Sequence, residues 1–232
     1  MKKVISIFSC FIIFINYAIS QNGCFFTTPV DDFGHKTRYS GDPYIDQINN
    51  REYYWLSNRF GVNPDFWYFQ ENEGPNCFAT DEVIDDNRPD GTVMLGLKLL
   101  KNECNNSSTK TCSAVPIILA HEFAHIVAYK YKSQFNIPFE EGSVEWELFA
   151  DYLAGIYMCF RVFQQAYTNV LEAAKSFFDK GGSGFHDDYS HGTAQQRYDC
   201  LDAGYKLVLN SSGSYISLEI AVRNAVTWVN QY

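Results

Sequence analysis

The stretch VPIILAHEFAH, residues 115–125, lies at the centre of the predicted fold. Its apolar residues would lie on every face of a helix, which is the pattern of a buried helix. Residues four apart share one face of a helix, so His121 and His125 can direct two imidazole nitrogens at one metal ion. Glu122 follows the first histidine directly, and there its carboxylate can act as general base on a water at the metal. The alternative is a buried helix with two hydrogen-bonded histidines.

A catalytic zinc ion needs a third protein ligand, and the segment VEWELFAD (144–151) supplies a candidate. Glu147 and Asp151 are four apart in an otherwise mostly apolar helical pattern, where a carboxylate is costly to bury without a partner or a cation. We therefore expect Glu147 to be the third ligand and Asp151 to accept a hydrogen bond from a ligand imidazole. The competing carboxylates, in a polar loop or on another helix face, are Glu140, Glu141 and Glu145. The alternative for Glu147 is a solvated charge.

The HEFAH motif, with Glu147 and Asp151 downstream, resembles the gluzincin zinc peptidases (HExxH plus ExxxD). The sequence is similar to bacterial neutral zinc metallopeptidases in ELFADYLAG (147–155) and in HGTAQQR (191–197). It is also similar to the soluble relatives of the CAAX-prenyl proteases. The resemblance covers roughly residues 45–210. It implies a zinc ion (Zn²⁺), a peptide or protein substrate and hydrolysis of a peptide bond.

The prenyl-protease clan places two strands before its active-site helix, and PNCFAT (75–80) and GTVMLGLKLL (91–100) look like those strands. We expect the strand 91–98 to be a sheet edge that pairs with extended substrate. Membrane members of that clan have several spanning helices. This sequence has none after its N-terminal apolar run, so prenyl-protein processing is not implied.

The motif HGTAQQR adds His191 and Arg197, with Thr193 as a predicted helix cap. The resemblance implies that His191 approaches the bound substrate and that Arg197 braces the site. An imidazole N–H can donate to the oxyanion of a tetrahedral intermediate, and Arg197 can pair in bidentate fashion with a carboxylate such as Asp151. The alternative is a capped surface helix with an exposed histidine. Two weaker candidates for the same role are His186 and Tyr189.

Apolar periodicity and turn signals predict an α+β fold, with a small N-terminal β-sheet and the active-site helix followed by a mostly helical C-terminal part. The predicted strands are 65–70, 77–80 and 91–100. The predicted helices are 44–60, 113–131, 144–163, 164–180, 193–209 and 214–230. We expect a single domain over residues 21–232. Its parts are a wrapping segment (21–44), a helix plus sheet (45–100) and the helical part (113–232).

The first twenty residues have the pattern of a cleaved signal peptide, with Lys2 and Lys3 before an apolar run and Ala18 and Ser20 at the cut. The alternative is an uncleaved membrane anchor. A cleaved signal predicts a secreted or periplasmic protein. Removing residues 1–20 leaves an even number of cysteines, which suggests disulfides in an oxidising compartment. Cys104 and Cys112 flank a polar loop and are predicted to pair. The alternative for the other cysteines is a small buried apolar side chain.

The formal net charge of −9, with no cluster of Lys or Arg, disfavours binding to nucleic acid or to an anionic membrane surface. The acidic run 81–90 lacks the spacing of a calcium loop and is expected to be a solvated loop.

Taken with the motifs above, the sequence predicts a zinc-dependent metallopeptidase with Glu122 as its general base. One alternative is a non-catalytic binding module that zinc stabilises. Another is a zymogen-like protein whose residues 21–44 cover the cleft.

Overall fold

The computed structural model of the chain describes residues 35–72, 74–106, 112, 114–164 and 191–232. Several features predicted from the sequence lie wholly or mostly outside these ranges. They are the signal peptide, most of the wrapping segment, the helix 164–180, and the residues His186 and Tyr189. Among the described residues, no helix is long and apolar enough to cross a bilayer.

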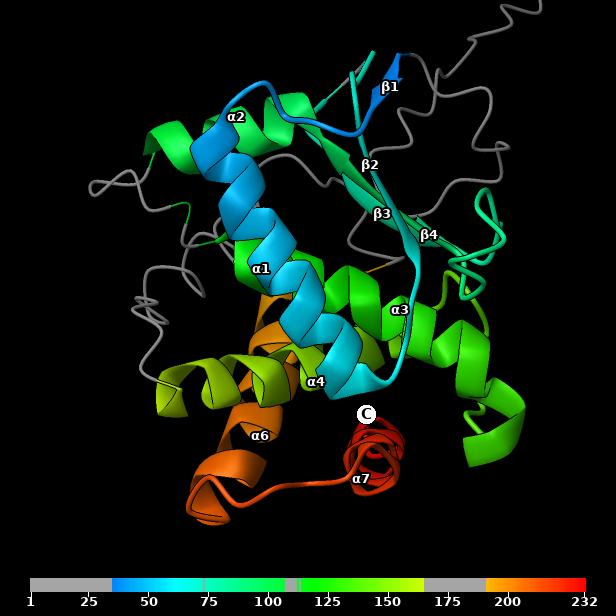
Figure 1. Cartoon of the computed structure of the whole chain (residues 1–232). Helices are drawn as coiled ribbons and strands as arrows, with labels where there is room; N and C mark the ends of the chain where they lie inside the picture. The colour runs from blue at the N-terminus through cyan, green and yellow to red at the C-terminus, as the bar shows by residue number, and fades with distance from the viewer. Residues whose placement is uncertain (1–34, 73, 107–111, 113, 165–190) are drawn as a thin grey trace, which may run out of the picture.

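The predicted α+β class is confirmed (Figure 1). A four-stranded sheet has the order β1-β2-β4-β3. Its strands are β1 (Lys36–Thr37), β2 (Asp65–Phe69), β3 (Cys77–Thr80) and β4 (Thr92–Gly96). β2 and β4 are parallel, and the two outer pairs are antiparallel. All five residues of β4 are buried, as expected for a strand that is paired on both sides and covered by other elements.

The expectation of an edge strand at 91–98 was wrong in two respects. β4 lies in the interior of the sheet, hydrogen-bonded to β2 and β3, so it cannot accept an added strand. The chain also leaves the sheet after Gly96 and begins α2 (Leu97–Asn106). The buried Glu71 carboxylate causes this turn, because it accepts hydrogen bonds from the Lys98 and Leu99 backbone N–H groups at 2.7 and 2.9 Å. No local signal at 97–100 reveals so distant a cap.

The helices end close to where the sequence predicts. They are α1 (Pro43–Phe60), α3 (Val115–Phe135), α4 (Val144–Phe163), α6 (Ala194–Asn210) and α7 (Leu218–Val229). Side-chain caps explain the starts: Asp42 caps α1, Ser143 caps α4 and Ser217 caps α7. At the end of α1, Gly61 adopts a left-handed conformation with φ of 64°, which ends the helix.

α3 is the central element of the molecule. Every residue from 115 to 128 is buried. Figure 1 shows α3 between the sheet on one side and α4 on the other, and α1 also packs against it. The contact with α1 includes an edge-to-face pair of Tyr53 and Phe123, with ring centroids 5.5 Å apart. An apolar helix of this kind holds any polar side chain on it in a fixed and dry environment.

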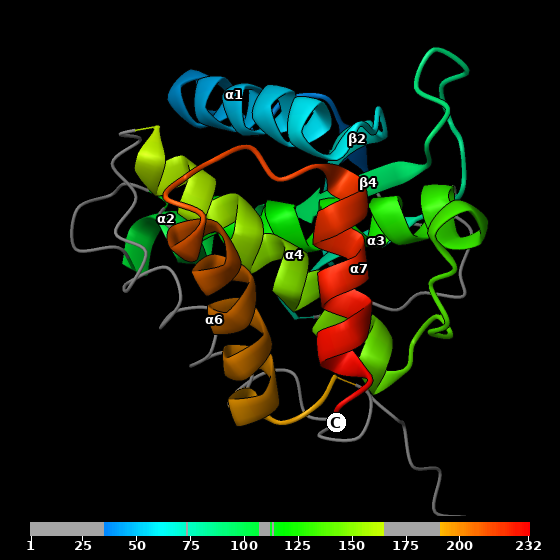
Figure 2. The same cartoon turned by 90° about the horizontal axis from the view of Figure 1, so that it is seen from below.

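α4 and α6 pack side by side and run in the same direction (Figure 2). Their backbones come close at two glycines. A Cβ atom added at Gly155 would lie 2.0 Å from the Leu201 carbonyl oxygen, and one added at Gly204 would lie 1.9 Å from the Tyr152 carbonyl oxygen. Only glycine permits this approach. The close contact brings the first turn of α6 against the part of α4 that carries Asp151.

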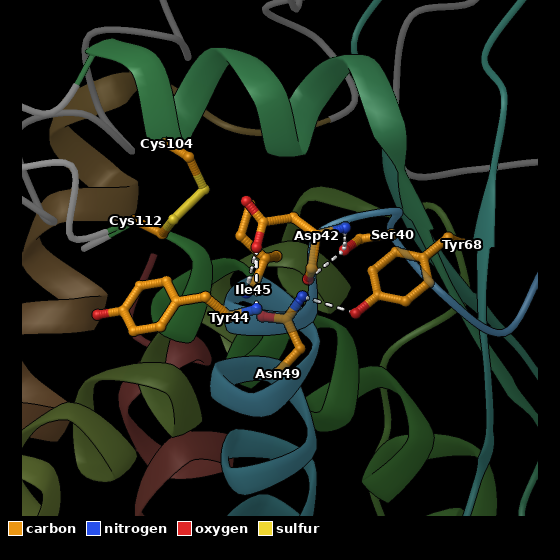
Figure 3. The surroundings of a disulfide bond; sticks show 8 residues. All are labelled: Ser40, Asp42, Tyr44, Ile45, Asn49, Tyr68, Cys104 and Cys112. Carbon is orange, nitrogen blue, oxygen red and sulfur yellow. Dashed lines mark hydrogen bonds between the residues drawn. A yellow bond between two sulfur atoms is a disulfide. The ribbon is translucent and has the colours of Figure 1, made fainter.

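The predicted disulfide between Cys104 and Cys112 is present. It joins the end of α2 to the residues before α3, and Figure 3 shows it beside the first turn of α1 at Tyr44 and Ile45. The other described cysteines carry free thiols and are buried: Cys77, Cys159 and Cys200. For these three the alternative of a small buried apolar side chain holds.

Candidate metal centre

Three segments far apart in the sequence meet beside α3. His121 and His125 come from α3, and Glu147 and Asp151 come from α4. Arg197 comes from the first turn of α6. All five side chains are buried, and Glu147 is only 3% exposed. The alternative of a solvated Glu147 is therefore excluded. The competing carboxylates Glu140, Glu141 and Glu145 are exposed.

The three predicted ligands converge on one point. His121 Nε2 lies 3.1 Å from His125 Nε2 and 3.2 Å from Glu147 Oε2, and His125 Nε2 lies 3.5 Å from Glu147 Oε1. Ligands that bind zinc at about 2.0–2.1 Å in a tetrahedron are separated from one another by roughly 3.3 Å. The observed separations match this value. The cluster of these three residues can therefore hold a metal ion.

The hydrogen bonds of Asp151 determine which His121 nitrogen is free to bind a metal. His121 Nδ1 lies 2.9 Å from Asp151 Oδ1, and since an ionised carboxylate only accepts, Nδ1 carries the hydrogen. Arg197 donates to the same carboxylate from Nε at 2.7 Å and from Nη2 at 2.9 Å. The predicted bidentate pair of Arg197 and Asp151 is thus present. In a neutral His121, the Nε2 lone pair then faces the Glu147 carboxylate, a repulsive arrangement without a shared cation.

The electrostatics of the cluster also call for a cation. Burial by itself would lower the pKa of His121, but the carboxylates of Asp151 and Glu147 outweigh it and raise the pKa to about 10. Burial lowers the pKa of His125 to about 3. Burial would raise the pKa of Glu147, but the surrounding imidazoles hold it well below its usual range. Without a metal, a proton on His121 neutralises the cluster, and a divalent cation can take its place.

His191 also reaches this cluster, but it contacts Glu147, whereas the resemblance implied a position beside the bound substrate. Its Nδ1 lies 3.2 Å from Glu147 Oε2, so the imidazole contacts a proposed ligand carboxylate. Thr193 caps α6 in a reciprocal capping box with Gln196, as the sequence predicted for the cap. Gly192 has a φ of 77°, and this left-handed turn carries the chain from His191 into the helix. At 8% exposure, His191 is not the exposed surface residue of the alternative interpretation.

Glu122 is buried on α3, the helix that packs against β3. Burial raises the pKa of the Cys77 thiol in β3, and the nearby Glu122 carboxylate raises it further. Glu122 is not one of the three residues of the metal-competent cluster. This agrees with a carboxylate that does not act as a ligand.

The acidic run 81–90 forms no comparable site among the described residues, where the only metal-competent cluster is the one above. Asp90 Oδ2 accepts hydrogen bonds from Lys130 Nζ at 2.7 Å and from the Asn63 backbone N–H at 2.6 Å. Asp85 Oδ1 accepts from the Asn87 backbone and side chain. The carboxylates of Asp85 and Asp90 therefore have hydrogen-bond partners within the protein.

Comparison of the chain with models of known families, with curated proteins and with solved structures gave no match. The two histidines of HExxH and a glutamate from the following helix nonetheless form one buried cluster. This is the arrangement of an HExxH-type metal site.

Proposed function

We propose that the protein is an exported, zinc-dependent metallopeptidase of the gluzincin type. The observation that carries the proposal is the convergence of His121 Nε2, His125 Nε2 and a Glu147 oxygen, all within 4.8 Å of one another and buried. Two imidazoles and one carboxylate are the ligand set of several catalytic zinc sites, in which the fourth position is left to water or substrate. Nitrogen and carboxylate ligands without thiolate also suit zinc better than the softer metals.

A zinc ion at this site would act as a Lewis acid on the substrate carbonyl and would lower the pKa of the attacking water. The side chains of the protein would do the rest. Glu122 would accept the proton of the water and pass it to the leaving amine. His191 would hold the Glu147 carboxylate in place through the 3.2 Å contact between its Nδ1 and Oε2, which we prefer to direct stabilisation of the oxyanion.

The Arg197–Asp151 pair would fix the tautomer and orientation of His121. Both side chains are buried, and their two hydrogen bonds allow the carboxylate little freedom to rotate. The close packing of α4 and α6 at Gly155 and Gly204 sets the distance between them.

An extended substrate would pair with β3. Within the described residues β3 has a strand neighbour on one side alone, namely β4, and it packs over α3. Backbone groups on the open side of such a strand bind a peptide without regard to its side chains. The signal-like N-terminus and the Cys104–Cys112 disulfide support a secreted or periplasmic location.

Glu122→Gln tests the function, because an amide keeps the shape of the side chain but cannot accept a proton. We expect zinc content to stay near one per chain and hydrolysis of a diverse peptide library to fall by at least about 10²–10⁴-fold. The matched control is Glu145→Gln, an exposed glutamate on α4, which leaves both unchanged. A wild-type protein that binds zinc and cleaves nothing would instead support a zinc-stabilised binding module. Normal turnover in Glu122→Gln would remove the proposed base.

A further inference from the structure

The two histidine ligands are oriented in different ways. The second nitrogen of His121 has a hydrogen bond to Asp151 at 2.9 Å. The second nitrogen of His125, its Nδ1, is buried and has no hydrogen-bond partner among the described residues. A ligand imidazole normally needs an outer partner that fixes its ring plane. Another contact must therefore restrain His125.

That contact is the indole ring of Trp146. It lies parallel to the His125 imidazole, with ring centroids 5.6 Å apart and planes inclined by 13°. On another side, the His121 ring is perpendicular to the His125 ring at 4.7 Å. The two rings together leave the His125 imidazole little room to turn about its χ2 angle.

Trp146 is itself held firmly. Its side chain is 3% exposed, and the Tyr129 ring packs on it with centroids 5.2 Å apart. Its backbone N–H donates to the Ser143 side chain at 3.2 Å, which caps α4. Because Glu147 follows Trp146 directly, this single cap places both the stacked ring and the third ligand.

We propose that Trp146 is a positioning residue of the metal site, whose indole ring holds the His125 imidazole in the orientation that a hydrogen bond gives to His121. The inference rests on the zinc site proposed above. A metal ion also draws electron density from the imidazole, so the indole face attracts the ring more strongly when metal is bound. The stack thus contributes to metal affinity and not to folding alone.

The test compares Trp146→Leu and Trp146→Phe with Phe149→Leu. Phe149 is a fully buried aromatic residue on the same helix, and its ring packs on Phe139. Zinc affinity is measured by competition with a chromophoric chelator, and the geometry of the site is measured from the visible spectrum of the cobalt-substituted protein. Circular dichroism verifies that each variant is folded.

We expect Trp146→Leu to bind zinc about 2- to 10-fold more weakly and to shift the cobalt bands, with Trp146→Phe between it and the wild type. Phe149→Leu should keep the wild-type affinity and spectrum despite its core defect. If Trp146→Leu does not fold, the comparison of Trp146→Phe with Phe149→Leu decides. Equal zinc affinity and equal cobalt spectra in the Trp146 and Phe149 variants would overturn the inference. Absence of zinc binding in the wild type would instead overturn the site itself.

Discussion

At the scale of single residues, the hydrogen on Nδ1 of His121 determines which nitrogen of that ring can bind a metal ion. The Asp151 carboxylate fixes that hydrogen, so the opposite nitrogen is the one that can give its lone pair to a metal ion that replaces its proton. Glu147 and His125 present further lone pairs to the same point at 3.1–3.5 Å. In a dry interior the lone pairs of the ring nitrogens and of the Glu147 carboxylate would repel one another at these distances. A cation between them removes this repulsion and stabilises the cluster.

Glu147→Gln should weaken zinc binding strongly, because an uncharged amide is a poor ligand for a divalent cation. Glu145→Gln is the matched control, since it makes the same chemical change two residues away on the exposed side of α4. Zinc per chain after dialysis, measured by atomic emission, separates the two variants. Loss of zinc in Glu145→Gln with retention in Glu147→Gln would mean that the wrong helix face was assigned.

Asp151→Asn should make the metal-free protein less stable at neutral pH by about 3–5 kcal/mol, because Arg197 is left buried without its partner. Burial alone would raise the pKa of Asp151, but Arg197 and His121 outweigh it and hold the pKa below its ordinary value of 3.8. A depressed pKa in the folded state means that the ionised carboxylate stabilises the fold above about pH 3.8, and that this contribution is lost as the pH falls further.

Urea unfolding in the presence of a chelator, from about pH 7 down to about pH 2.5, measures this effect. The difference between the wild type and Asp151→Asn should be constant above about pH 4 and should narrow below it, since a protonated Asp151 resembles the amide. A difference that stays constant or widens in acid would contradict the assigned pKa direction.

At the scale of elements, the predictions succeeded where the signals are local. The stop at Gly61, the cap at Ser143 and the apolar pattern of 115–128 each act within a few residues, and the ends of α1 and α4 follow from them. The capping box of Thr193 is equally local. These features are readable because their partners lie within one helical turn.

The failures at the same scale involve distant partners. α2 begins at Leu97 because the Glu71 carboxylate reaches its first backbone N–H groups, a contact across more than 25 residues. β4 lies in the interior of the sheet because it pairs with β2 as well as with β3. The chain has to cross over before β4 can lie beside β2. β1 was missed because a two-residue strand has no periodicity, and its register on β2 is fixed by Arg38, which pairs with Asp65.

The cluster of two histidines and one glutamate comes together for a related reason. His121, His125, Glu147 and Asp151 follow from spacing within a helix, which any helix preserves. The contact of His191 with Glu147 and the stacking of Trp146 on His125 depend on how separate elements pack. For Trp146 the sequence offered only an apolar neighbour of Glu147.

The Cys104–Cys112 disulfide tethers the N-terminus of α3, where no side chain caps the helix. Replacing both cysteines with serine should lower the free energy of unfolding by about 2–3 kcal/mol, as expected for a loop with a sequence separation of 8. Chemical denaturation with and without reductant measures this. Reductant should destabilise the wild type to the level of the double variant and leave the double variant unchanged. A double variant as stable as the oxidised wild type would contradict the role of the tether.

For the molecule as a whole, the candidate metal centre joins α3, which packs against the sheet, to the helix α4. α3 packs under the sheet, α4 packs on α6, and the residues that could hold a metal come from α3 and α4. A metal ion that binds only the folded chain stabilises it in proportion to its affinity and concentration. The fold and the proposed site therefore depend on each other. α3 and α4 bury the cluster, and a metal ion bound there would hold the same two helices together.

The most direct test of the central claim is an anomalous difference map from crystals of the zinc-loaded protein, recorded at the zinc absorption edge. One peak should lie about 2.0–2.2 Å from His121 Nε2, His125 Nε2 and an oxygen of Glu147. Asp151 should remain outside the coordination sphere. A saturated protein with no peak among these three residues, or with its peak at another site, would contradict the account.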